Sequence, residues 1–258
     1  MAATYLDRIL ERHRETAAAD TRQIEHLLEQ ARAMPPARGF RAALDGRSSL
    51  GVIAEIKRRS PSKGDLNADL DPAEMARTYE RGGAACLSVL TDVEHFGGSI
   101  TDLQAARTAC TLPVIRKDFT VAEHDVLDAR IMGADCVLLI AAALDPAELA
   151  GFHALAIEVG LDVLVEIHDE RELEHALAAE ATLIGVNQRD LVTFQVDHER
   201  AVRMAGVIPD HAVKVAESGV RGADDASSLR AAGYDAVLVG ETLVTSGDPA
   251  AAIADLIG

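Results

Sequence analysis

Glu55 and Lys57 stand at the end of an apolar run that starts at Val52 and passes into a loop rich in Ser, Pro and Gly. In a β-strand the side chains alternate, so Glu55 and Lys57 would lie on one side and Ile56 on the other. Burying a carboxylate and an ammonium is costly unless both groups are used. For this run taken alone, the simpler interpretation is that the charges mark where a strand reaches water.

Polar residues also end other short apolar runs of the chain. The candidates at these ends are Lys117, Glu166, Asn187, Glu217, Ser218 and Gly240. The first residues of the same runs include no Lys and no Glu. Carboxylates that face a lysine favour its protonated form and fix the direction in which its ammonium group points. If the ends meet on one rim, the pattern favours a catalytic site over ordinary solvated strand ends.

A regular alternation of short β-rich runs and helical segments would bring these ends together. The predicted strands are 52–57, 85–90, 113–117, 135–141, 162–167, 182–187, 213–217 and 235–240. The predicted helices between them are 72–82, 102–110, 123–132, 145–159, 170–179, 197–205 and 223–232. This order predicts an α/β fold, a (β/α)8 TIM barrel with its site at the carboxyl ends of the strands. A doubly wound open sheet is less favoured, since no G-x-G-x-x-G motif follows the first strand.

Residues 4–33 show a separate helical pattern that Pro35-Pro36 ends. We therefore predict an N-terminal helical extension, residues 1–46, of a single barrel domain that spans 1–258. Hydrophobic residues make up 48% of the chain, but aromatic residues only 3%. The core must therefore consist of Ala, Val, Leu and Ile, which suits buried parallel strands.

The formal net charge of −17 limits the partners of the chain. Nucleic acids and anionic membranes bind positive surfaces, so neither is expected as the main partner. The sequence has no charged-then-apolar leader and no run of transmembrane length, and we expect a cytoplasmic protein. Cys86, Cys110 and Cys136 are odd in number and lack C-x-x-C spacing, which favours buried free thiols over a disulfide or a zinc site.

His168, Glu172 and His175 have a spacing that metal ligands on a helix can show. We assign them instead to the outer, solvated part of the helix after the fifth strand. No other motif requires a metal ion, a flavin or a nicotinamide, so we predict neither a metal nor a cofactor.

Two Gly-containing loops follow the last two predicted strands. Ser218-Gly219 and Gly240-Glu241 both offer backbone amides, and a short helix is predicted after the second. Barrels of this class commonly bind phosphate here. The carboxylate of Glu241 would repel an anion, so only its backbone amide is expected to bind. We therefore predict a small phosphorylated substrate.

Six segments together resemble the indole-3-glycerol-phosphate synthase family of tryptophan biosynthesis. They are E-I-K-R-R-S-P-S-K-G at 55–64, F-G-G-S at 96–99, R-K-D-F at 116–119, L-V-E-I-H-D at 164–169, G-V-N-Q-R-D-L at 185–191 and A-E-S-G-V at 216–220. The resemblance covers nearly the whole chain from residue 50, and the N-terminal extension is also similar to that of the family. The chain departs from the family at Gln188, where a second Asn is frequent, and at His124-Asp125, where Tyr-Gln is usual.

The resemblance implies closure of 1-(2-carboxyphenylamino)-1-deoxyribulose 5-phosphate to an indole ring, with loss of carbon dioxide and water. Lys117 is then the general acid at the ketone oxygen. Lys57 binds the substrate carboxylate or phosphate, or supplies the acid of the dehydration step, and the sequence leaves this choice open. Glu166 orients Lys117 or removes a proton, and Glu55 is the base of pyrrole formation.

By the same resemblance, Asn187 and Glu217 hold the sugar hydroxyls and pair with a lysine. The residues expected to contact the substrate are Ser60, Phe96, Phe119, Leu138, Arg189, Ser218, Gly219, Leu238, Gly240 and Glu241, with Arg189 behind the others. For the two phenylalanines, core packing is an equal alternative to lining an aromatic pocket. Residues 60–64 are expected to close over the substrate.

Two other functions stay open at this point. A ketose isomerase or another phosphosugar enzyme on the same fold would need Cys or Asp pairs at the strand ends, where Lys and Glu stand instead. A phosphate-binding barrel subunit without activity predicts a broken set of acids and bases, whereas this set is complete. The sequence decides neither the oligomeric state, with a monomer as one option, nor an association with other enzymes of tryptophan biosynthesis.

Overall fold

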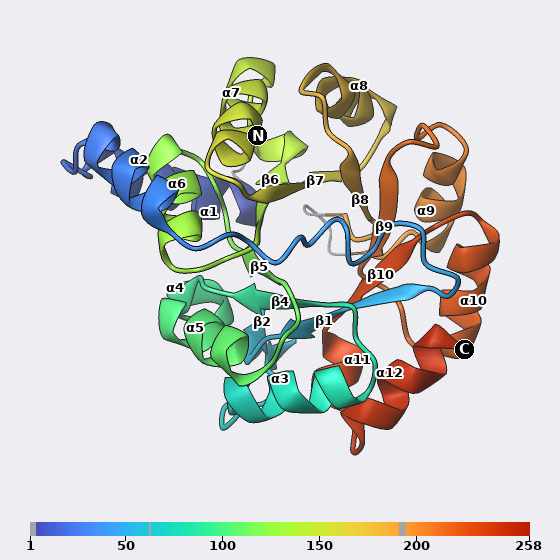
Figure 1. Cartoon of the computed structure of the whole chain (residues 1–258). Helices are drawn as coiled ribbons and strands as arrows, with labels where there is room; N and C mark the ends of the chain where they lie inside the picture. Colours follow the sequence, from blue (N-terminus) through green and yellow to red (C-terminus); the bar gives the residue numbers. More distant parts are fainter. Residues whose placement is uncertain (1–3, 62, 191–194) are drawn as a thin grey trace.

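The computed structural model describes residues 4–61, 63–190 and 195–258, so the motif residues Ser62 and Leu191 lie outside the described ranges. Eight parallel strands close into a barrel in which β1 neighbours both β4 and β10 (Figure 1). The strands are β1 (Gly51–Ile56), β4 (Cys86–Leu90), β5 (Val114–Lys117), β6 (Cys136–Ile140), β7 (Asp162–Ile167), β8 (Leu183–Asn187), β9 (Val213–Glu217) and β10 (Ala236–Val239). The predicted (β/α)8 TIM barrel is confirmed, and each predicted strand agrees with the observed one to within about one residue at either end.

Helices cover the outside of the barrel. The longer ones are α3 (Pro72–Arg81), α5 (Ile100–Ala109), α6 (Glu123–Ile131), α7 (Pro146–Glu158), α8 (Glu170–Ala178), α9 (His198–Ala205), α10 (Ala223–Ala231) and α12 (Pro249–Ile257). The short elements are β2 (Arg59–Ser60) and β3 (Gly64–Asp65), which pair antiparallel, α4 (Val93–Phe96), a 3-10 turn (Ala141–Ala143) and α11 (Glu241–Val244). Of these elements, β2, β3, α4, the 3-10 turn and α12 are not among the predicted ones. Several helices begin with an Asp cap followed by Pro, as at Asp71-Pro72, because the carboxylate accepts free amides of the first turn and Pro needs no acceptor there.

Side chains along each strand alternate between the barrel interior and the layer under the helices. On β1, Val52, Ala54 and Ile56 pack under the helices, whereas Ile53 belongs to the cluster inside the barrel. Glu55 therefore faces inward, nearer the carboxyl end of the strand. At or next to the ends of β5, β7, β8 and β9, the residues that also face the interior are Lys117, Glu166, Asn187 and Glu217. The alternation thus directs the candidate catalytic side chains into the carboxyl end of the barrel.

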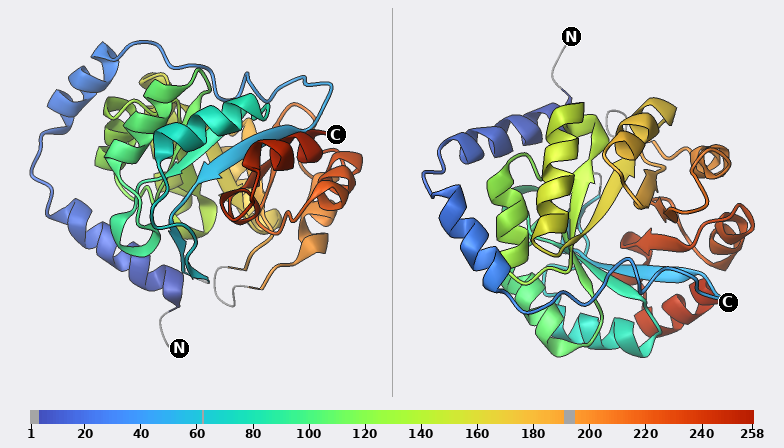
Figure 2. Two further views of the ribbon diagram at one scale, coloured as in Figure 1. Left: turned by 90° about the horizontal axis from the view of Figure 1, so that it is seen from below. Right: turned by 45° about the horizontal axis from the view of Figure 1, so that its top comes forward.

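Two helices, α1 (Tyr5–Ala18) and α2 (Ile24–Ala33), replace the single helical segment predicted over 4–33. The prediction was wrong between 19 and 23, because the Asp20 carboxylate accepts a hydrogen bond from the Arg22 backbone amide (2.9 Å) and forms a local turn. Figure 2 shows α1 along one end of the barrel and the segment 34–50 across the other. The N-terminal extension therefore covers both ends.

The segment 34–50 closes the amino end of the barrel. Phe40 in this segment is fully buried in the cluster inside the barrel. The Asp135 carboxylate accepts a hydrogen bond from the Arg38 amide (2.9 Å), and Asp162 accepts one from the Arg41 amide (2.8 Å). The aspartates at the starts of the strands thus fasten this segment, while the carboxyl ends carry the candidate chemistry.

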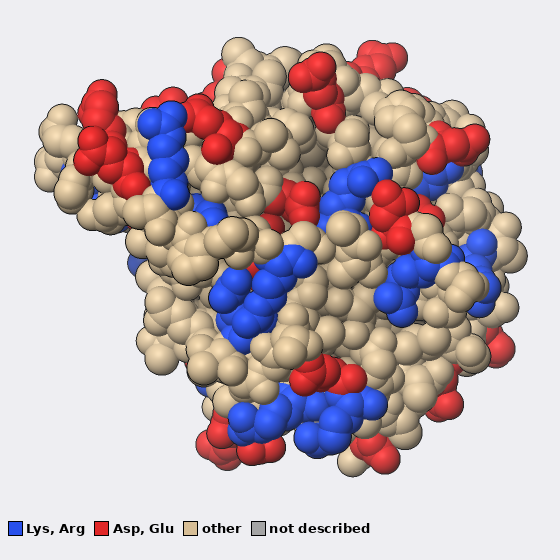
Figure 3. Space-filling view, in the orientation of Figure 1, with Lys and Arg blue, Asp and Glu red and all other residues tan. Residues whose placement is uncertain are grey.

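Positive and negative side chains are mixed on the face shown in Figure 3, where Lys and Arg lie among Asp and Glu. Cys86, Cys110 and Cys136 are buried and free, as predicted. Within the described part of the chain, no helix is both long and apolar enough to cross a membrane.

Candidate active site

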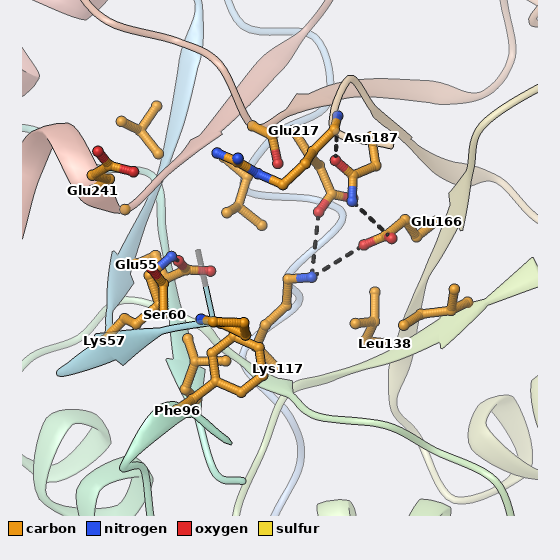
Figure 4. A pocket seen from close by; sticks show the side chains of 18 of the residues that line it. Glu55, Lys57, Ser60, Phe96, Lys117, Leu138, Glu166, Asn187, Glu217 and Glu241 are labelled. Carbon is orange, nitrogen blue, oxygen red and sulfur yellow. Dashed lines mark hydrogen bonds and ion pairs between the residues drawn. The ribbon is translucent and has the colours of Figure 1, made fainter. Parts of the chain in front are cut away.

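A cavity of about 250 Å³ lies at the carboxyl end of the barrel. All six residues to which the sequence assigns chemistry line it: Glu55, Lys57, Lys117, Glu166, Asn187 and Glu217 (Figure 4). The ten predicted substrate contacts line the same cavity: Ser60, Phe96, Phe119, Leu138, Arg189, Ser218, Gly219, Leu238, Gly240 and Glu241. The fold therefore brings together every residue of the predicted site.

Lys117 is the centre of a chain of polar contacts. Its Nζ lies 3.1 Å from Glu166 Oε2 and 3.5 Å from Glu217 Oε2. Asn187 Nδ2 donates a hydrogen bond to Glu166 Oε1 (3.0 Å), and the Arg189 amide donates one to Asn187 Oδ1 (3.0 Å). The ammonium is therefore held between two carboxyl groups, one of which an amide fixes in turn (Figure 4).

Burial and charge set the protonation of this group. Burial lowers the pKa of Lys117, but nearby carboxylates, led by Glu166 and Glu217, outweigh it and raise that pKa above its ordinary value. Burial raises the pKa of Glu217 to about 8, and the charge of Glu166 acts in the same direction. Burial also disfavours charge on Glu166, but Lys117 and His168 outweigh it and lower the Glu166 pKa. At neutral pH the group thus holds an ammonium, one carboxylate and one protonated carboxyl.

Glu55 and Lys57 form a second ion pair in the cavity. Glu55 Oε1 accepts a hydrogen bond from Lys57 Nζ (2.5 Å), and Oε2 accepts one from Ser88 Oγ (3.4 Å). The prediction that Glu55 and Lys57 lie on one side of the strand is therefore confirmed. Each of the two lysines in the site has its own carboxylate partner.

The two loops predicted to bind phosphate lie in the wall of the cavity. In the first loop, Ser218 and Gly219 both have positive φ (65° and 76°). Thr242 Oγ1 of the second loop donates a hydrogen bond to the Val220 carbonyl of the first (2.8 Å), so the two loops are connected. α11 begins at Glu241, and the amides of Leu243 and Val244 donate to the Gly240 carbonyl (3.0 and 2.9 Å). The first two amides, of Glu241 and Thr242, have no acceptor within such a helix. The Glu241 carboxylate lies 3.6 Å from Lys63 Nζ, so it is paired with the loop after β1.

Apolar side chains line another part of the cavity. The rings of Phe96 and Phe119 lie 6.3 Å apart between centroids, and both are half-buried. Their partial exposure in the cavity favours the predicted aromatic pocket over core packing. Tyr5, Leu6 and Ile9 of α1 also line the cavity, although the sequence analysis gave α1 no part in the site. The sequence indicates only that these three residues share one face of a helix. It does not indicate which surface of the protein that face covers.

A buried polar cluster fastens α1 over the cavity. His13 Nε2 of α1 lies 3.1 Å from Asp92 Oδ2 and 4.0 Å from Asp118 Oδ1. Burial raises the pKa of Asp92, but hydrogen bonds from His13 and His95 outweigh it and hold that pKa well below its ordinary value. The ionised Asp92 thus joins α1 to the loop after β4.

The sequence analysis assigned His168, Glu172 and His175 to a solvated outer part of the helix. For His168 this prediction was wrong. Its side chain is only 12% exposed, and its Nε2 lies 3.8 Å from Glu166 Oε1. Its Nδ1 lies 3.0 Å from Glu172 Oε2. The error arose because His168 precedes the first residue of α8, Glu170, so helical periodicity does not describe its direction.

Gln188 and His124, at the two departures from the family's sequence pattern, each contact a loop, and His124 does so from α6. Gln188 is 2% exposed, and its Nε2 donates to the Ser218 carbonyl (2.7 Å). His124 Nε2 lies 3.0 Å from the Arg22 carbonyl, between α1 and α2. Gln188 therefore supports a cavity loop from behind.

Gly185 leaves room for the carboxyl group of Glu217. A Cβ at Gly185 would lie 2.0 Å from Glu217 Oε1. We expect Gly185→Ala to displace this carboxyl and lower kcat up to about 100-fold. Stability should change less, because the displaced atoms are the ends of two side chains, Glu217 and Leu164 (3.2 Å from the added Cβ). Steady-state kinetics and thermal unfolding measure the two effects.

Gly151→Ala in α7 is the matched control, since no described atom lies within 4 Å of a Cβ added there. We expect it to keep the wild-type kcat. A wild-type kcat in Gly185→Ala as well would contradict a need for the observed Glu217 position.

Comparisons with known proteins agree with this geometry. The family model for indole-3-glycerol phosphate synthase matches residues 6–256. The indole-3-glycerol phosphate synthase 2 of Streptomyces coelicolor is 55% identical over 232 residues, 90% of this chain and 90% of that protein. The indole-3-glycerol phosphate synthase of Mycolicibacterium smegmatis is 48% identical over 258 residues, 99% of this chain and 94% of that protein.

Similarity among solved structures extends to proteins with little sequence identity. The 3-hexulose-6-phosphate synthase of Salmonella typhimurium has a TM-score of 0.64 at 15% identity, covering 80% of this chain and 96% of that one. This likeness shows the fold alone. The match to the family model and the identities near 50% over nearly the whole chain decide more: the chain belongs to the indole-3-glycerol phosphate synthase family, decarboxylating lyases of tryptophan biosynthesis that act on a phosphorylated small molecule.

Proposed function

We propose that Lys117 is the general acid of the first step in the family's ring closure. As the aromatic carbon that bears the carboxylate attacks the ketone carbon, the ketone oxygen takes the Lys117 proton and becomes a hydroxyl. The observation that carries this proposal is the ammonium held at 3.1 and 3.5 Å from two buried carboxyl groups, Glu166 and Glu217. These contacts keep the lysine charged. Its proton therefore passes only to a strong base, such as the ketone oxygen when it gains negative charge during the attack.

The later steps remove carbon dioxide and then water. The ring carboxylate leaves as carbon dioxide, and its bonding electrons restore the aromatic ring. The new hydroxyl then leaves as water with a proton from an acid, while a base takes a proton from the neighbouring carbon to complete the pyrrole double bond. We assign the base to Glu55 and the acid to Lys57, whose pairing at 2.5 Å supports linked proton transfers on one side of the intermediate.

The remaining residues bind and orient the substrate in this proposal. Backbone amides of Gly219 and Gly240 hold the phosphate, and Asn187 and Glu217 contact the sugar hydroxyls. The half-buried ring of Phe119, with its neighbours in the apolar wall, accommodates the anthranilate ring. The described residues of the segment 60–64, which are Ser60, Pro61, Lys63 and Gly64, form the cover. The pair between Lys63 and Glu241 at 3.6 Å supports this assignment by linking the cover to a phosphate loop.

All of these groups come from one chain, so we propose a monomer as the simplest functional form. The three buried free cysteines support a reducing compartment, and we propose the cytoplasm. Association with other enzymes of tryptophan biosynthesis stays a separate hypothesis.

Mixing the purified protein with 1-(2-carboxyphenylamino)-1-deoxyribulose 5-phosphate and recording indole fluorescence tests the proposed function. We expect fluorescence to rise in proportion to protein concentration. No rise over buffer, with substrate binding retained, would contradict it and favour the phosphate-binding barrel without activity. A ketose isomerase is disfavoured because Lys and Glu occupy the strand ends in the cavity. The two aspartates in its wall, Asp92 and Asp118, lie in loops and are paired with His13 and Arg116.

Ionisation of Glu217 is expected to limit activity at alkaline pH. Its pKa of about 8 means that the group is neutral below pH 8 and becomes anionic above it. The added negative charge holds the Lys117 proton more tightly, so kcat should fall as the pH rises through about 8. Glu217→Gln keeps the neutral shape, so it should lose this descending limb while remaining active near neutral pH. A kcat–pH profile with the same limb in both proteins would contradict the assignment.

A further inference from the structure

His168 connects the active site to α8 through a line of charged side chains. Its imidazole stands between two carboxyl groups, with Glu172 Oε2 3.0 Å from Nδ1 and Glu166 Oε1 3.8 Å from Nε2. Glu172 Oε2 also accepts the backbone amide of His168 (2.7 Å), which fixes this carboxylate in front of the ring. The three side chains therefore form a path from the helix to the residue that pairs with Lys117.

The two ring nitrogens of His168 face oxygens that only accept hydrogen bonds. Nδ1 must carry a proton, because an ionised Glu172 cannot donate. Nε2 is buried and, among the residues that the structure describes, has no hydrogen-bond partner. A neutral ring would direct the Nε2 lone pair toward a Glu166 oxygen, which is repulsive, whereas a protonated Nε2 is attracted to it. The geometry thus favours the imidazolium form.

Charged groups from the neighbouring elements act on this ring in both directions. Glu166 of β7 and Glu172 of α8 favour its protonation, and Arg200 of α9 opposes it. Burial lowers the His168 pKa, but the hydrogen bond and charge of Glu172 together with Glu166 outweigh it, and the pKa is raised. The protonated form is therefore more favourable here than in a free histidine.

The carboxyl groups of Glu166 and Glu217 face the same ammonium but have different surroundings. Glu166 has the His168 ring and the Asn187 amide beside Oε1. Glu217 Oε1 is buried and has no hydrogen-bond partner within the described residues. Since an anion is stabilised by a second cation and by donors, the two groups are not equivalent holders of a proton.

We propose that His168 is a positioning residue that acts through Glu166: as an imidazolium anchored by Glu172 it keeps Glu166 ionised and leaves the shared proton on Glu217. The inference rests on the roles proposed above for Lys117 and Glu166. An ionised Glu166 holds Lys117 in the direction of the ketone oxygen, and a neutral Glu217 avoids a second negative charge that would retain the Lys117 proton. His168 thus decides which of the two carboxyl groups is the anion.

Kinetics of His168→Gln test this role. The variant keeps a polar side chain but loses the positive charge, so Glu166 takes up a proton more readily. We expect the acidic limb of the kcat–pH profile to move up by about one pH unit, which lowers kcat about tenfold on that limb, with KM close to that of the wild type. His175→Gln on α8 is the matched control and should keep the wild-type profile, because His175 does not line the cavity.

An unchanged acidic limb in a folded His168→Gln protein would overturn the proposal, even if its thermal stability fell, because a merely structural role moves stability alone. Wild-type turnover in the same assay separates this outcome from a failure of the proposed function.

Nitrogen NMR of the histidine rings provides a test that does not depend on activity. The ring of His168 can be assigned by site-specific spectral changes in Glu172→Gln and by its absence in His168→Gln. We expect both ring nitrogens to be protonated at pH 7, with deprotonation above the ordinary histidine value of about 6.5, and Glu172→Gln should lower this midpoint. A neutral His168 ring at pH 7 in the wild type would overturn the proposal.

Discussion

Lys117→Met is expected to abolish indole formation, with kcat lowered about 10²- to 10⁴-fold, while the protein stays folded. Met fills a similar volume but has no proton to give. The carboxyl groups that lose their cation can adapt, because Glu217 already holds a proton at neutral pH and Glu166 keeps the hydrogen bond from Asn187. Indole fluorescence at saturating substrate and thermal unfolding by circular dichroism measure activity and folding separately.

Lys214→Met is the matched control for this substitution. Lys214 is also largely buried on a barrel strand, but it lies outside the cavity, and its Nζ donates to the Ala205 carbonyl (3.1 Å). We expect Lys214→Met to lower stability and to keep kcat near the wild-type value. Near-wild-type turnover in Lys117→Met would contradict the assignment of Lys117 as the general acid.

Glu55→Gln is expected to stop the reaction after carbon dioxide has left. Gln keeps the shape of the side chain and can still accept the Lys57 hydrogen bond, but it cannot take the proton whose loss completes the pyrrole ring. In a single turnover, release of labelled carbon dioxide should continue, whereas indole fluorescence should develop about 10²-fold more slowly. Lys117→Met, by contrast, should lose both signals. Parallel loss of both signals in Glu55→Gln would contradict a base that acts only in the last step.

Gly240→Ala tests the position of Glu55 without changing its chemistry. A Cβ at Gly240 would lie 2.3 Å from Glu55 Oε1 and 3.1 Å from its Cβ. The φ of Gly240 is −123°, so alanine is not strained by the backbone and the effect is one of space. We expect the same delay between carbon dioxide release and fluorescence as in Glu55→Gln, and Gly151→Ala should show none.

The sequence predicted the barrel and the site because both depend on simple alternation. The outward residues of β1, such as Val52 and Ala54, are apolar, and its inward row changes from Ile53 to Glu55 toward the carboxyl end. The change from an apolar to a charged inward side chain is visible in the sequence, and the structure places it at the carboxyl end of the strand. The residues of the predicted site therefore met in one cavity once the strands closed in order.

The features that the sequence did not predict depend on contacts between distant segments. The turn at Asp20, which separates α1 from α2, arises from one side-chain hydrogen bond. The spacing of apolar residues over 4–33 does not predict it. The approach of α1 to the cavity depends on His13 reaching Asp92, about 80 residues away in the chain. His168 was misassigned because its direction is set by Glu172 and by the end of β7, not by a helical face.

A crystal structure with a substrate analogue in which the ketone is reduced to an alcohol tests the central claim most directly. We predict that the new hydroxyl oxygen lies within about 3 Å of Lys117 Nζ, with Glu166 and Glu217 still beside the ammonium and the phosphate on the amides near Gly219 and Gly240. An analogue bound with its hydroxyl on Lys57, and with Lys117 turned away from the ligand, would contradict the account.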